Sequence, residues 1–336
     1  MSLQLIDSEV FGWSQESVLN LSRAFTESRI LLTAAELDLF TLLAGKPLTA
    51  EVIANRIGAD LRALRILLDA LSAMGLLVKR DDCYQSEETA ARLLSAESPD
   101  SVLPMVLHNA TLWERWGQLS RTVGGPKAAQ NAANKSLRSF IGAMHVIARP
   151  LAARIVSIIK PGNARKLLDI GGASGTYTIA FLRQAPQLKA TLFDRLPVVE
   201  MAREVIASAG MTNRVTLVEG DFYQDPLPSG HDLAFVSAII HQNTQAENVS
   251  LFRKGFDALE PGGRIVVRDH VLNVDRTQPK AGAIFAVNML AGGGGGNSYT
   301  LDEINDAMAH AGFTKIQLIH PDERMDGLVE GFKPSP

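Results

Sequence analysis

Glycines and acidic residues in the C-terminal half stand at spacings that could bind a nucleoside ligand. The stretch D-I-G-G-A-S-G at 169–175 places glycines at a predicted strand-to-helix turn, where the backbone can approach a ligand and helix N–H groups face it. A dinucleotide site, G-x-G-x-x-G, would need its first glycine at position 170, which is Ile170. An acid followed by G-x-x-x-G instead suits a ligand with a cationic amine and no pyrophosphate. An ordinary tight turn is the alternative.

Further polar residues end the following predicted strands. Asp194 lies 19 residues beyond Gly175, where a carboxylate can accept hydrogen bonds from both ribose hydroxyls; an exposed loop aspartate is the alternative. Asp221 could take an adenine amino group, with Phe222 stacking on the base. His241 directly follows the apolar stretch 233–240, so we expect its ring to point into a site. A core-facing histidine that bonds to the backbone is the alternative reading.

These residues need a parallel sheet to bring them together. From Lys166 onward, strands alternate with helices, which predicts an α/β fold with a mostly parallel sheet and helices on both faces. Ligands of such sheets bind at the carboxyl ends of the strands, where the motifs stand. The predicted strands are 166–170, 191–193, 215–218, 233–240 and 264–267, and the predicted helices are 176–184, 197–209 and 246–259.

The first 95 residues have a helical pattern. A helix capped by Thr49, a second capped by Asp60 with its apolar face running to Met74, and a hairpin over 76–85 follow the order of a winged helix. Such a unit could read DNA. However, five basic and five acidic residues balance between Thr49 and Asp82, which favours a structural or dimerising role. We expect a dimerisation domain over 1–98 and a second domain over 99–336, with 99–160 as a helical linker and substrate layer.

Composition excludes several classes of protein. The 336 residues include 33 basic and 36 acidic ones, a net charge of −3 that is a poor footprint for nucleic-acid binding. The single cysteine, Cys83, excludes an internal disulfide and a cysteine-based metal cluster, and no other metal-ligand spacing is present. We find neither a signal peptide nor an apolar run near the roughly 20 residues of a membrane span, so we expect a cytoplasmic protein without membrane contacts.

Five motifs in order resemble the class I S-adenosylmethionine-dependent methyltransferases. More narrowly, the chain resembles the plant caffeate-type and bacterial small-molecule O-methyltransferases, whose N-terminal winged-helix region dimerises. The resemblance covers nearly the whole chain and implies a Rossmann-like domain with a seven-stranded sheet. The motifs are L-L-D-I-G-G-A-S-G at 167–175, F-D-R-L-P at 193–197, G-D-F at 220–222, D-L-A-F-V-S-A-I-I-H at 232–241 and A-L-E-P-G-G-R-I-V-V-R-D-H-V-L at 258–272.

The resemblance assigns expected roles to individual residues. It implies S-adenosyl-L-methionine as cofactor, S-adenosyl-L-homocysteine as product, no metal, a small-molecule acceptor and a homodimer through the N-terminal helices. The general base falls on His241 and its carboxylate partner on Asp269. The expected cofactor residues are Asp169, Gly171, Gly172, Gly175, Asp194, Arg195, Asp221, Phe222 and Ser237. The expected acceptor residues are Met144, His145, Asn288, Met289 and Ser298.

The chain departs from the family pattern around the histidine. Ser237, Gln242 and Asn243 replace a Lys, an Asp and a Trp, and Ser298 stands where a Glu usually holds the histidine. The run 292–296 is either a lid over the site or a plain flexible loop. Methyl transfer to the hydroxyl of a small aromatic or polycyclic acceptor is therefore the leading hypothesis. The alternatives are a C- or N-methyltransferase that relies on alignment without a base, and a non-methylating cofactor-binding or regulatory protein.

Overall fold

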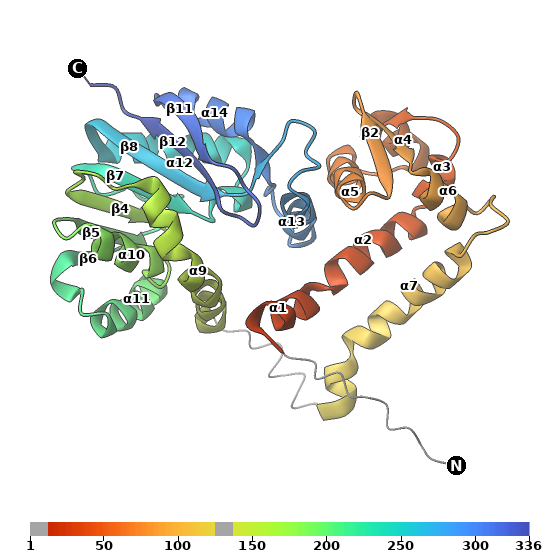
Figure 1. Cartoon of the computed structure of the whole chain (residues 1–336), viewed down its shortest axis with the longest axis horizontal. Coiled ribbons are helices and arrows are strands. Elements are labelled where there is room, and N and C mark those ends of the chain that lie inside the picture. The colour runs from red at the N-terminus through yellow and green to blue at the C-terminus, as the bar shows by residue number, and fades with distance from the viewer. Residues whose placement is uncertain (1–12, 125–136, 336) are drawn as a thin grey trace, which may run out of the picture.

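The computed structural model describes residues 13–124 and 137–335, which form two connected units (Figure 1). The N-terminal unit is mainly helical and carries a small sheet. The C-terminal unit is an α/β layer structure around a seven-stranded sheet. The expectation of an α/β fold preceded by a helical, winged-helix-like unit is confirmed, while the boundary at residue 98 stays a prediction.

The N-terminal unit follows the predicted winged-helix order. Its small sheet has the order β1-β3-β2, and the side chains of Thr49 and Asp60 accept hydrogen bonds from N–H groups in the first turns of their helices, as the sequence predicts. The helical pattern that precedes Thr49 is divided at Ala24, between the first two helices. The elements are α1 (Gln15–Arg23), α2 (Phe25–Glu36), α3 (Leu39–Leu42), β1 (Leu48–Thr49), α4 (Ala50–Ile57), α5 (Leu61–Ala73), β2 (Leu77–Arg80), β3 (Cys83–Ser86), α6 (Glu88–Leu94) and α7 (Leu103–Gly117), which packs along α2.

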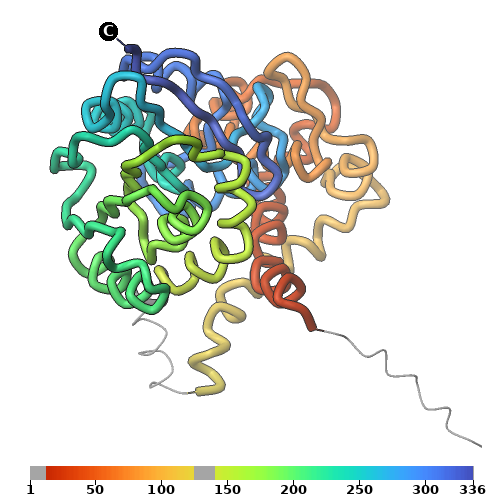
Figure 2. The backbone as a smooth tube through the Cα atoms, turned by 60° about the vertical axis from the view of Figure 1, so that its left-hand side comes forward, coloured from red at the N-terminus to blue at the C-terminus, as the bar shows by residue number. Residues whose placement is uncertain are grey.

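The helix that would enter a DNA groove is covered by the other unit. Helix α5 packs against α13 (Lys280–Ala291), and Ile284 and Val287 of α13 join the apolar cluster of the N-terminal unit. Figure 2 shows the orange N-terminal segment lying against this blue helix. Helix α5 therefore forms a contact between the two units.

The large sheet has the order β11-β12-β8-β7-β4-β5-β6. The five strands from β8 to β6 run parallel, and β12 pairs antiparallel with both β8 and β11 at one edge. The sequence located the five parallel strands but neither β11 nor β12. The strands are β4 (Lys166–Ile170), β5 (Lys189–Asp194), β6 (Val215–Glu219), β7 (His231–Ser237), β8 (Leu259–Asp269), β11 (Thr314–His320) and β12 (Gly327–Phe332); β9 (Val271–Leu272) and β10 (Tyr299–Thr300) form a separate short pair.

Helices cover both faces of this sheet because successive strand residues point to opposite sides. Leu167 joins the apolar cluster under α9 and α10, whereas its neighbour Leu168 joins the cluster under α12 and α14. The parallel strands therefore read as continuous apolar runs. The helices are α9 (Leu137–Ile159), α10 (Thr176–Gln184), α11 (Leu196–Ser208), α12 (Gln245–Ala258) and α14 (Leu301–His310).

One helix passes the length and composition test for a membrane span. The segment Ile141–Ile159 of α9 is long and apolar enough to cross a bilayer, so the expectation that no run approaches this length is wrong. Ile155, Val156 and Ile159 are nevertheless buried against the sheet. The apolar side of α9 thus forms part of the core of the α/β unit.

Candidate active site

The glycine-rich turn after β4 requires glycine for steric reasons. At Gly171 φ is +67°, and a Cβ atom there would lie 2.2 Å from Cδ1 of Ile239. Ala173, with φ of +47°, is also left-handed although it carries a side chain. Such conformations concentrate at ligand-binding turns, where the surrounding structure holds them. Gly175 forms the N-cap of α10, so the first turn of that helix begins directly beside this loop.

Asp194 is fixed against the glycine turn. Its Oδ2 accepts a hydrogen bond from the Ala173 N–H at 2.9 Å, and its Oδ1 accepts one from the Arg195 N–H at 2.8 Å. Burial raises the pKa of this carboxyl, while the two N–H groups oppose the rise. The half-buried carboxylate lies where the sequence predicted it, at the carboxyl end of β5.

The aromatic residue after β6 also reaches this edge. Phe222 lies 3.6 Å from where a Cβ on Gly171 would be, and its ring packs against Tyr223 with centroids 4.6 Å apart. Asp221 uses one carboxylate oxygen within its own turn, accepting from the Tyr223 N–H at 2.9 Å. Gly171, Asp194 and Phe222 therefore converge at one edge of the sheet.

Asp169 lies beneath the turn rather than on its surface. Its side chain accepts a hydrogen bond from the Thr178 hydroxyl, and its Cγ lies 3.0 Å from where a Cβ on Gly172 would be. Burial raises the pKa of Asp169 to about 7, helped by the nearby Asp194 charge and opposed by the Thr178 hydrogen bonds. The residue supports the turn from below and places a titratable carboxyl under it.

The sequence predicts that His241 directly follows a strand, and this is wrong. Strand β7 ends at Ser237, Ala238 takes a left-handed conformation with φ of +56°, and residues 240–242 form a short 3-10 turn. The predicted strand 233–240 was too long because apolar residues continue past its end: Ile239 and Ile240 are buried by tertiary packing. The left-handed residue redirects the chain, and His241 is carried on the turn that follows.

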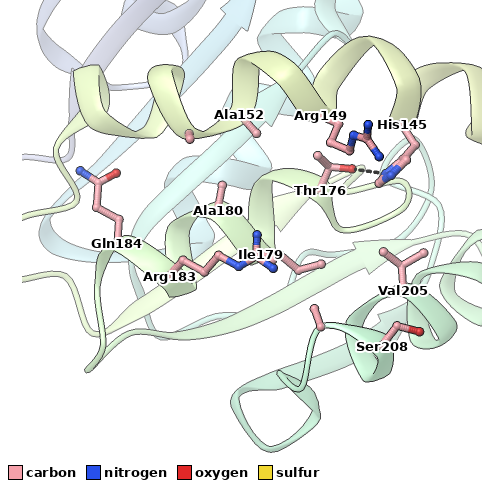
Figure 3. A pocket seen from close by; sticks show the side chains of 12 residues that line it. His145, Arg149, Ala152, Thr176, Ile179, Ala180, Arg183, Gln184, Val205 and Ser208 are labelled. Carbon is pink, nitrogen blue, oxygen red and sulfur yellow. Dashed lines mark hydrogen bonds between the residues drawn. The ribbon is translucent and has the colours of Figure 1, made fainter.

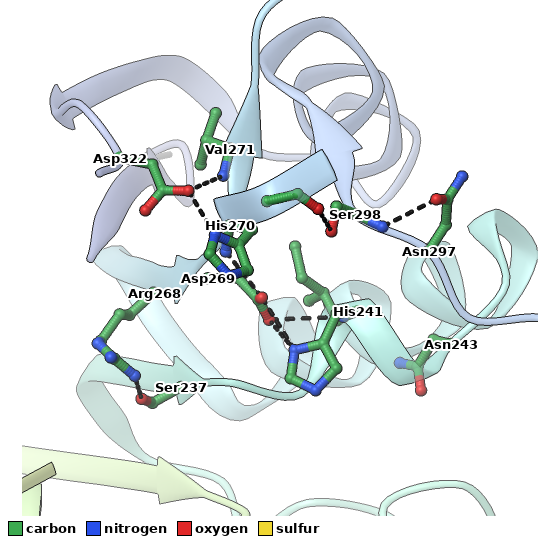
Figure 4. A network of polar contacts seen from close by, with 12 residues as sticks. Ser237, His241, Asn243, Arg268, Asp269, His270, Val271, Asn297, Ser298 and Asp322 are labelled. Carbon is green, nitrogen blue, oxygen red and sulfur yellow. Dashed lines mark hydrogen bonds and ion pairs between the residues drawn. The ribbon is translucent and has the colours of Figure 1, made fainter. Parts of the chain in front are cut away.

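His241 and Asp269 form a close pair at the ends of β7 and β8 (Figure 4). Nδ1 of His241 lies 2.9 Å from Oδ1 and 3.0 Å from Oδ2 of Asp269, whose side chain is 1% exposed against 12% for the histidine. Burial alone would raise the pKa of Asp269, but attraction and hydrogen bonding from His241 hold it below its usual value. Because a carboxylate only accepts, Nδ1 must carry a proton, and in the neutral imidazole this leaves Nε2 as a hydrogen-bond acceptor.

Phe285 of α13 packs on the His241 ring and was not among the predicted site residues. The two ring centroids are 4.8 Å apart with an interplanar angle of 87°. Asn288 and Met289 follow at positions i+3 and i+4, so they lie along the same side of the helix as Phe285. The sequence did not single out Phe285, because α13 is strongly apolar and shows no single apolar face.

Ser298 is directed away from His241. Its buried hydroxyl donates to the Gly282 carbonyl oxygen at 2.8 Å, so it does not replace a carboxylate beside the histidine. The neighbouring Asn297 N–H donates to the His241 carbonyl oxygen at 2.8 Å. The 292–298 segment thus holds the backbone of the histidine turn rather than its ring.

A hydrogen-bond network around Asn243 also holds this turn. Asn243 is fully buried; its Oδ1 accepts from the Tyr223 hydroxyl at 2.5 Å, and its Nδ2 donates to Oδ1 of Asn248 at 2.9 Å. The Tyr299 hydroxyl donates to the Asn243 carbonyl oxygen. The hydrogen bonds of the buried Asn243 therefore hold the turn at the position where the family pattern has a tryptophan.

His145 lies beside the glycine turn. Its Nδ1 is 2.8 Å from the Thr176 hydroxyl oxygen (Figure 3). The same nitrogen is 3.3 Å from the Ser174 hydroxyl oxygen. His145 lines a groove of about 520 Å³ between α9, α10 and α11, which Arg149 and Arg183 also line, whereas Met144 is half-buried on the same helix. Within residues 13–124 and 137–335, no three His, Cys, Asp or Glu side chains are grouped so as to hold a metal ion.

Comparison with known proteins identifies the family. Residues 112–314 match the O-methyltransferase domain and residues 19–96 match the O-methyltransferase dimerisation domain. The chain is 31% identical to a 3-hydroxy-5-methyl-1-naphthoate 3-O-methyltransferase of Streptomyces sahachiroi, over 94% of each chain. It is 32% identical to the tetracenomycin polyketide synthesis 8-O-methyl transferase of Streptomyces glaucescens, over 89% of this chain and 91% of that one.

The fold is similar to that of a solved O-methyltransferase. An O-methyltransferase family 2 protein from Planctomyces limnophilus, solved in complex with apigenin, superposes with a TM-score of 0.79 at 24% identity, over 96% of this chain and 97% of the other. The chain belongs to the small-molecule O-methyltransferase family and is an S-adenosylmethionine-dependent enzyme with an N-terminal dimerisation domain.

Proposed function

We propose that this enzyme methylates a hydroxyl of a small aromatic or polycyclic acceptor, with His241 as general base. The observation that carries the proposal is the His241–Asp269 pair, in which the carboxylate fixes the tautomer and leaves Nε2 without a partner among the described residues. The names of the two Streptomyces relatives, which act on a hydroxynaphthoate and a tetracenomycin polyketide, support an aromatic acceptor.

The residues at the glycine turn fit the cofactor. A Cβ atom at Gly171 or Gly172 would fill the space beside the turn, and the Asp194 carboxylate is held in place by two N–H groups. In this proposal Asp194 binds the ribose hydroxyls, Phe222 stacks on the adenine, and ionised Asp169 favours the cationic amine from below. When bound, S-adenosylmethionine supplies a methyl group that its sulfonium already activates.

The role of His241 is to remove a proton. A phenol with a pKa near 10 is mostly protonated at neutral pH, so a base at the acceptor hydroxyl contributes about 10²–10⁴-fold to the rate. Nε2 of His241 accepts that proton, and ionised Asp269 stabilises the imidazolium that results. Phe285, with Asn288 and Met289 along the same helix face, would form an acceptor wall and hold the hydroxyl near Nε2.

We also propose that the enzyme works as a homodimer. Helix α1 has no buried residue, and large apolar side chains of α1, α2 and α7 are exposed, among them Leu21 at 63%, Phe25 at 56% and Trp116 at 68%. A partner subunit that covers these side chains would remove a considerable apolar area from water. A cytoplasmic setting, supported by the single cysteine, completes the proposal.

Labelled cofactor and a panel of hydroxyarenes test the proposed reaction directly. We expect label in a product whose methyl group is lost on ether cleavage; a methyl group that resists cleavage would place the transfer on carbon. The Asp194→Ala variant should bind the cofactor roughly 10- to 150-fold more weakly in titration calorimetry, as for a lost charged hydrogen bond. Exposed Asp257 provides the matched Ala control. Unchanged affinity of the Asp194 variant would remove that residue from the site.

A further inference from the structure

Arg268 carries a buried guanidinium group. It is 3% exposed, and in the described part of the chain its guanidinium forms no ion pair. Its one hydrogen bond runs from Nη1 to the Ser237 hydroxyl oxygen at 3.1 Å, and its Nε has no partner. A guanidinium stays charged at any physiological pH, so burying it without an anion is costly.

A second unpartnered group lies beside it. The ring of Tyr177 is buried, and its centroid is 5.3 Å from the Arg268 guanidinium carbon. The Tyr177 hydroxyl is one of two buried side-chain polar atoms in the described residues that lack a partner, and Nε of Arg268 is the other. The Arg268 Nε–H can only donate, and the Tyr177 hydroxyl can donate as well. Buried polar groups are normally hydrogen-bonded, so two neighbouring donors without acceptors indicate a missing acceptor.

Their position links them to the reaction. Arg268 immediately precedes Asp269 and pairs in register with Ser237 at the ends of β8 and β7. Side chains alternate along a strand, so Arg268 lies on the same face of the sheet as Val266. Asp169 lies on the same face as Leu167 for the same reason. Val266 and Leu167 both belong to the apolar cluster under α9 and α10, so Arg268 and Asp169 share this face. Tyr177 lies in the first turn of α10, directly after the glycine turn. The two donors thus lie on the sheet face that also carries Asp169 below the glycine turn, and Arg268 directly precedes the aspartate of the histidine pair (Figure 4 shows Arg268, Ser237 and Asp269).

We propose that Arg268 and Tyr177 bind a carboxylate of a reactant. Arginine offers a planar fork that suits a carboxylate, and the tyrosine hydroxyl adds a further donor. Two reactants could supply it: the amino-acid carboxylate of the methyl donor, or a carboxylate on an aromatic acceptor. This inference rests on the proposed function, since both sources are ligands of the methyl-transfer site.

Binding of matched ligands to the Arg268→Met variant tests the cofactor as source. S-adenosylhomocysteine carries the carboxylate, and its decarboxylated analogue lacks only that group. If the cofactor supplies the carboxylate, the variant should bind S-adenosylhomocysteine about 10- to 100-fold more weakly than wild type, the range for charge-assisted hydrogen bonds. It should bind the decarboxylated analogue within about twofold of wild type, in keeping with a loss confined to the carboxylate contact. The Arg253→Met variant, altered at an exposed arginine of α12, is the control.

A parallel measurement tests the acceptor as source. Binding of a hydroxyarene carboxylate is compared with that of its carboxamide, with S-adenosylhomocysteine present. A loss confined to the carboxylate would assign Arg268 to the acceptor, and equal losses for all four ligands would overturn the proposal. If Arg268→Met does not fold, Arg268→Lys and Tyr177→Phe replace it, each with a smaller loss that must again be confined to a carboxylate ligand. A wild-type enzyme that binds neither cofactor ligand would instead contradict the proposed function.

Discussion

Two histidine–aspartate pairs lie next to each other at the end of β8, and they differ in what their carboxylates hold. His241 meets Asp269 from the neighbouring end of β7, whereas His270 meets Asp322 from the connection between β11 and β12. Phe285 packs against both rings, with centroid distances of 4.8 Å to His241 and 5.1 Å to His270. In both rings Nδ1 faces the carboxylate, and Nε2 has no hydrogen-bond partner in the described residues.

Access and backbone setting separate the two pairs. The His241 side chain is 12% exposed on a short turn after a left-handed residue, while that of His270 is 5% exposed between β8 and β9. Asp322 also accepts from the Val271 N–H and the Asp326 N–H, so it ties the 320–326 segment to the sheet. An imidazole–carboxylate contact alone therefore does not identify a general base. The proposal gives proton transfer to His241, and we propose that His270 holds Asp322 and its segment to the sheet.

Replacing His241 should have the largest effect on turnover. For His241→Ala we expect kcat to fall by about 10²–10⁴-fold, because the acceptor hydroxyl loses its base. Affinity for S-adenosylhomocysteine should stay within about twofold, since a lost base removes an interaction of the transition state. Steady-state kinetics with a methylated product as readout, and calorimetry for binding, check both parts. Near-native turnover would mean that His241 is not the base, and His270→Ala would then be the variant to compare.

Replacing Asp269 should have the next largest effect on turnover. Asp269→Asn keeps the shape of the site but cannot stabilise an imidazolium, so kcat should fall by about 10- to 100-fold, as when a group that orients a reactive residue is lost. The lowered pKa of Asp269 also predicts a pH effect on stability. The ionised Asp269 side chain contributes favourably to the free energy of unfolding above its unfolded pKa near 3.9. This contribution is lost as the pH falls through the lower pKa of the folded state.

Denaturant unfolding of wild type and Asp269→Asn at several pH values measures that contribution. The stability difference between the two should be constant above about pH 6 and should shrink below about pH 4. A difference that grew on acidification would show that the carboxylate is a net burden to the fold when ionised. The assignment of Asp269 as the stabilising partner of His241 would then be withdrawn.

Replacing His270 should lower the stability of the fold and leave turnover nearly unchanged. For His270→Gln we expect unfolding free energy to fall by about 1–3 kcal/mol, because a buried carboxylate loses its partner, while kcat changes by less than about threefold. Chemical denaturation and kinetics on the same preparation give both numbers. Replacement of His320, a partly exposed histidine that faces Asp326, is the control. A larger loss of kcat than of stability would place His270 in the chemistry and remove the contrast between the pairs.

Sequence predicted the parts of the site that end consecutive parallel strands. Asp194 and Asp269 follow buried apolar runs, and parallel strand ends must meet at one edge, so their approach to the glycine turn and to His241 could be predicted. Asp322 could not, because it comes from the loop between two edge strands that the sequence did not resolve. Phe285 was missed because α13 is apolar on all sides, and the turn at Ala238 because nothing in an alanine signals a left-handed backbone.

The smallest expected effect concerns support that only His241 receives. Arg62 of α5 donates to the carbonyl oxygens of Gly295 at 2.9 Å and Gly296 at 2.6 Å, and the next residue, Asn297, holds the His241 backbone. His270 lies between β8 and β9, and in the described residues no such chain of hydrogen bonds links it to the N-terminal unit. Arg62→Met should therefore loosen the histidine turn and raise the KM for the acceptor by about two- to fivefold, equivalent to about 1 kcal/mol. The free energy of unfolding should change little.

Arg65→Met on the same helix, which removes an exposed ion pair with Glu51, is the control and should leave the KM for the acceptor unchanged. Equal KM values in the two variants would show that the N-terminal unit does not position His241, and the contrast between the two histidines would rest on the C-terminal unit alone.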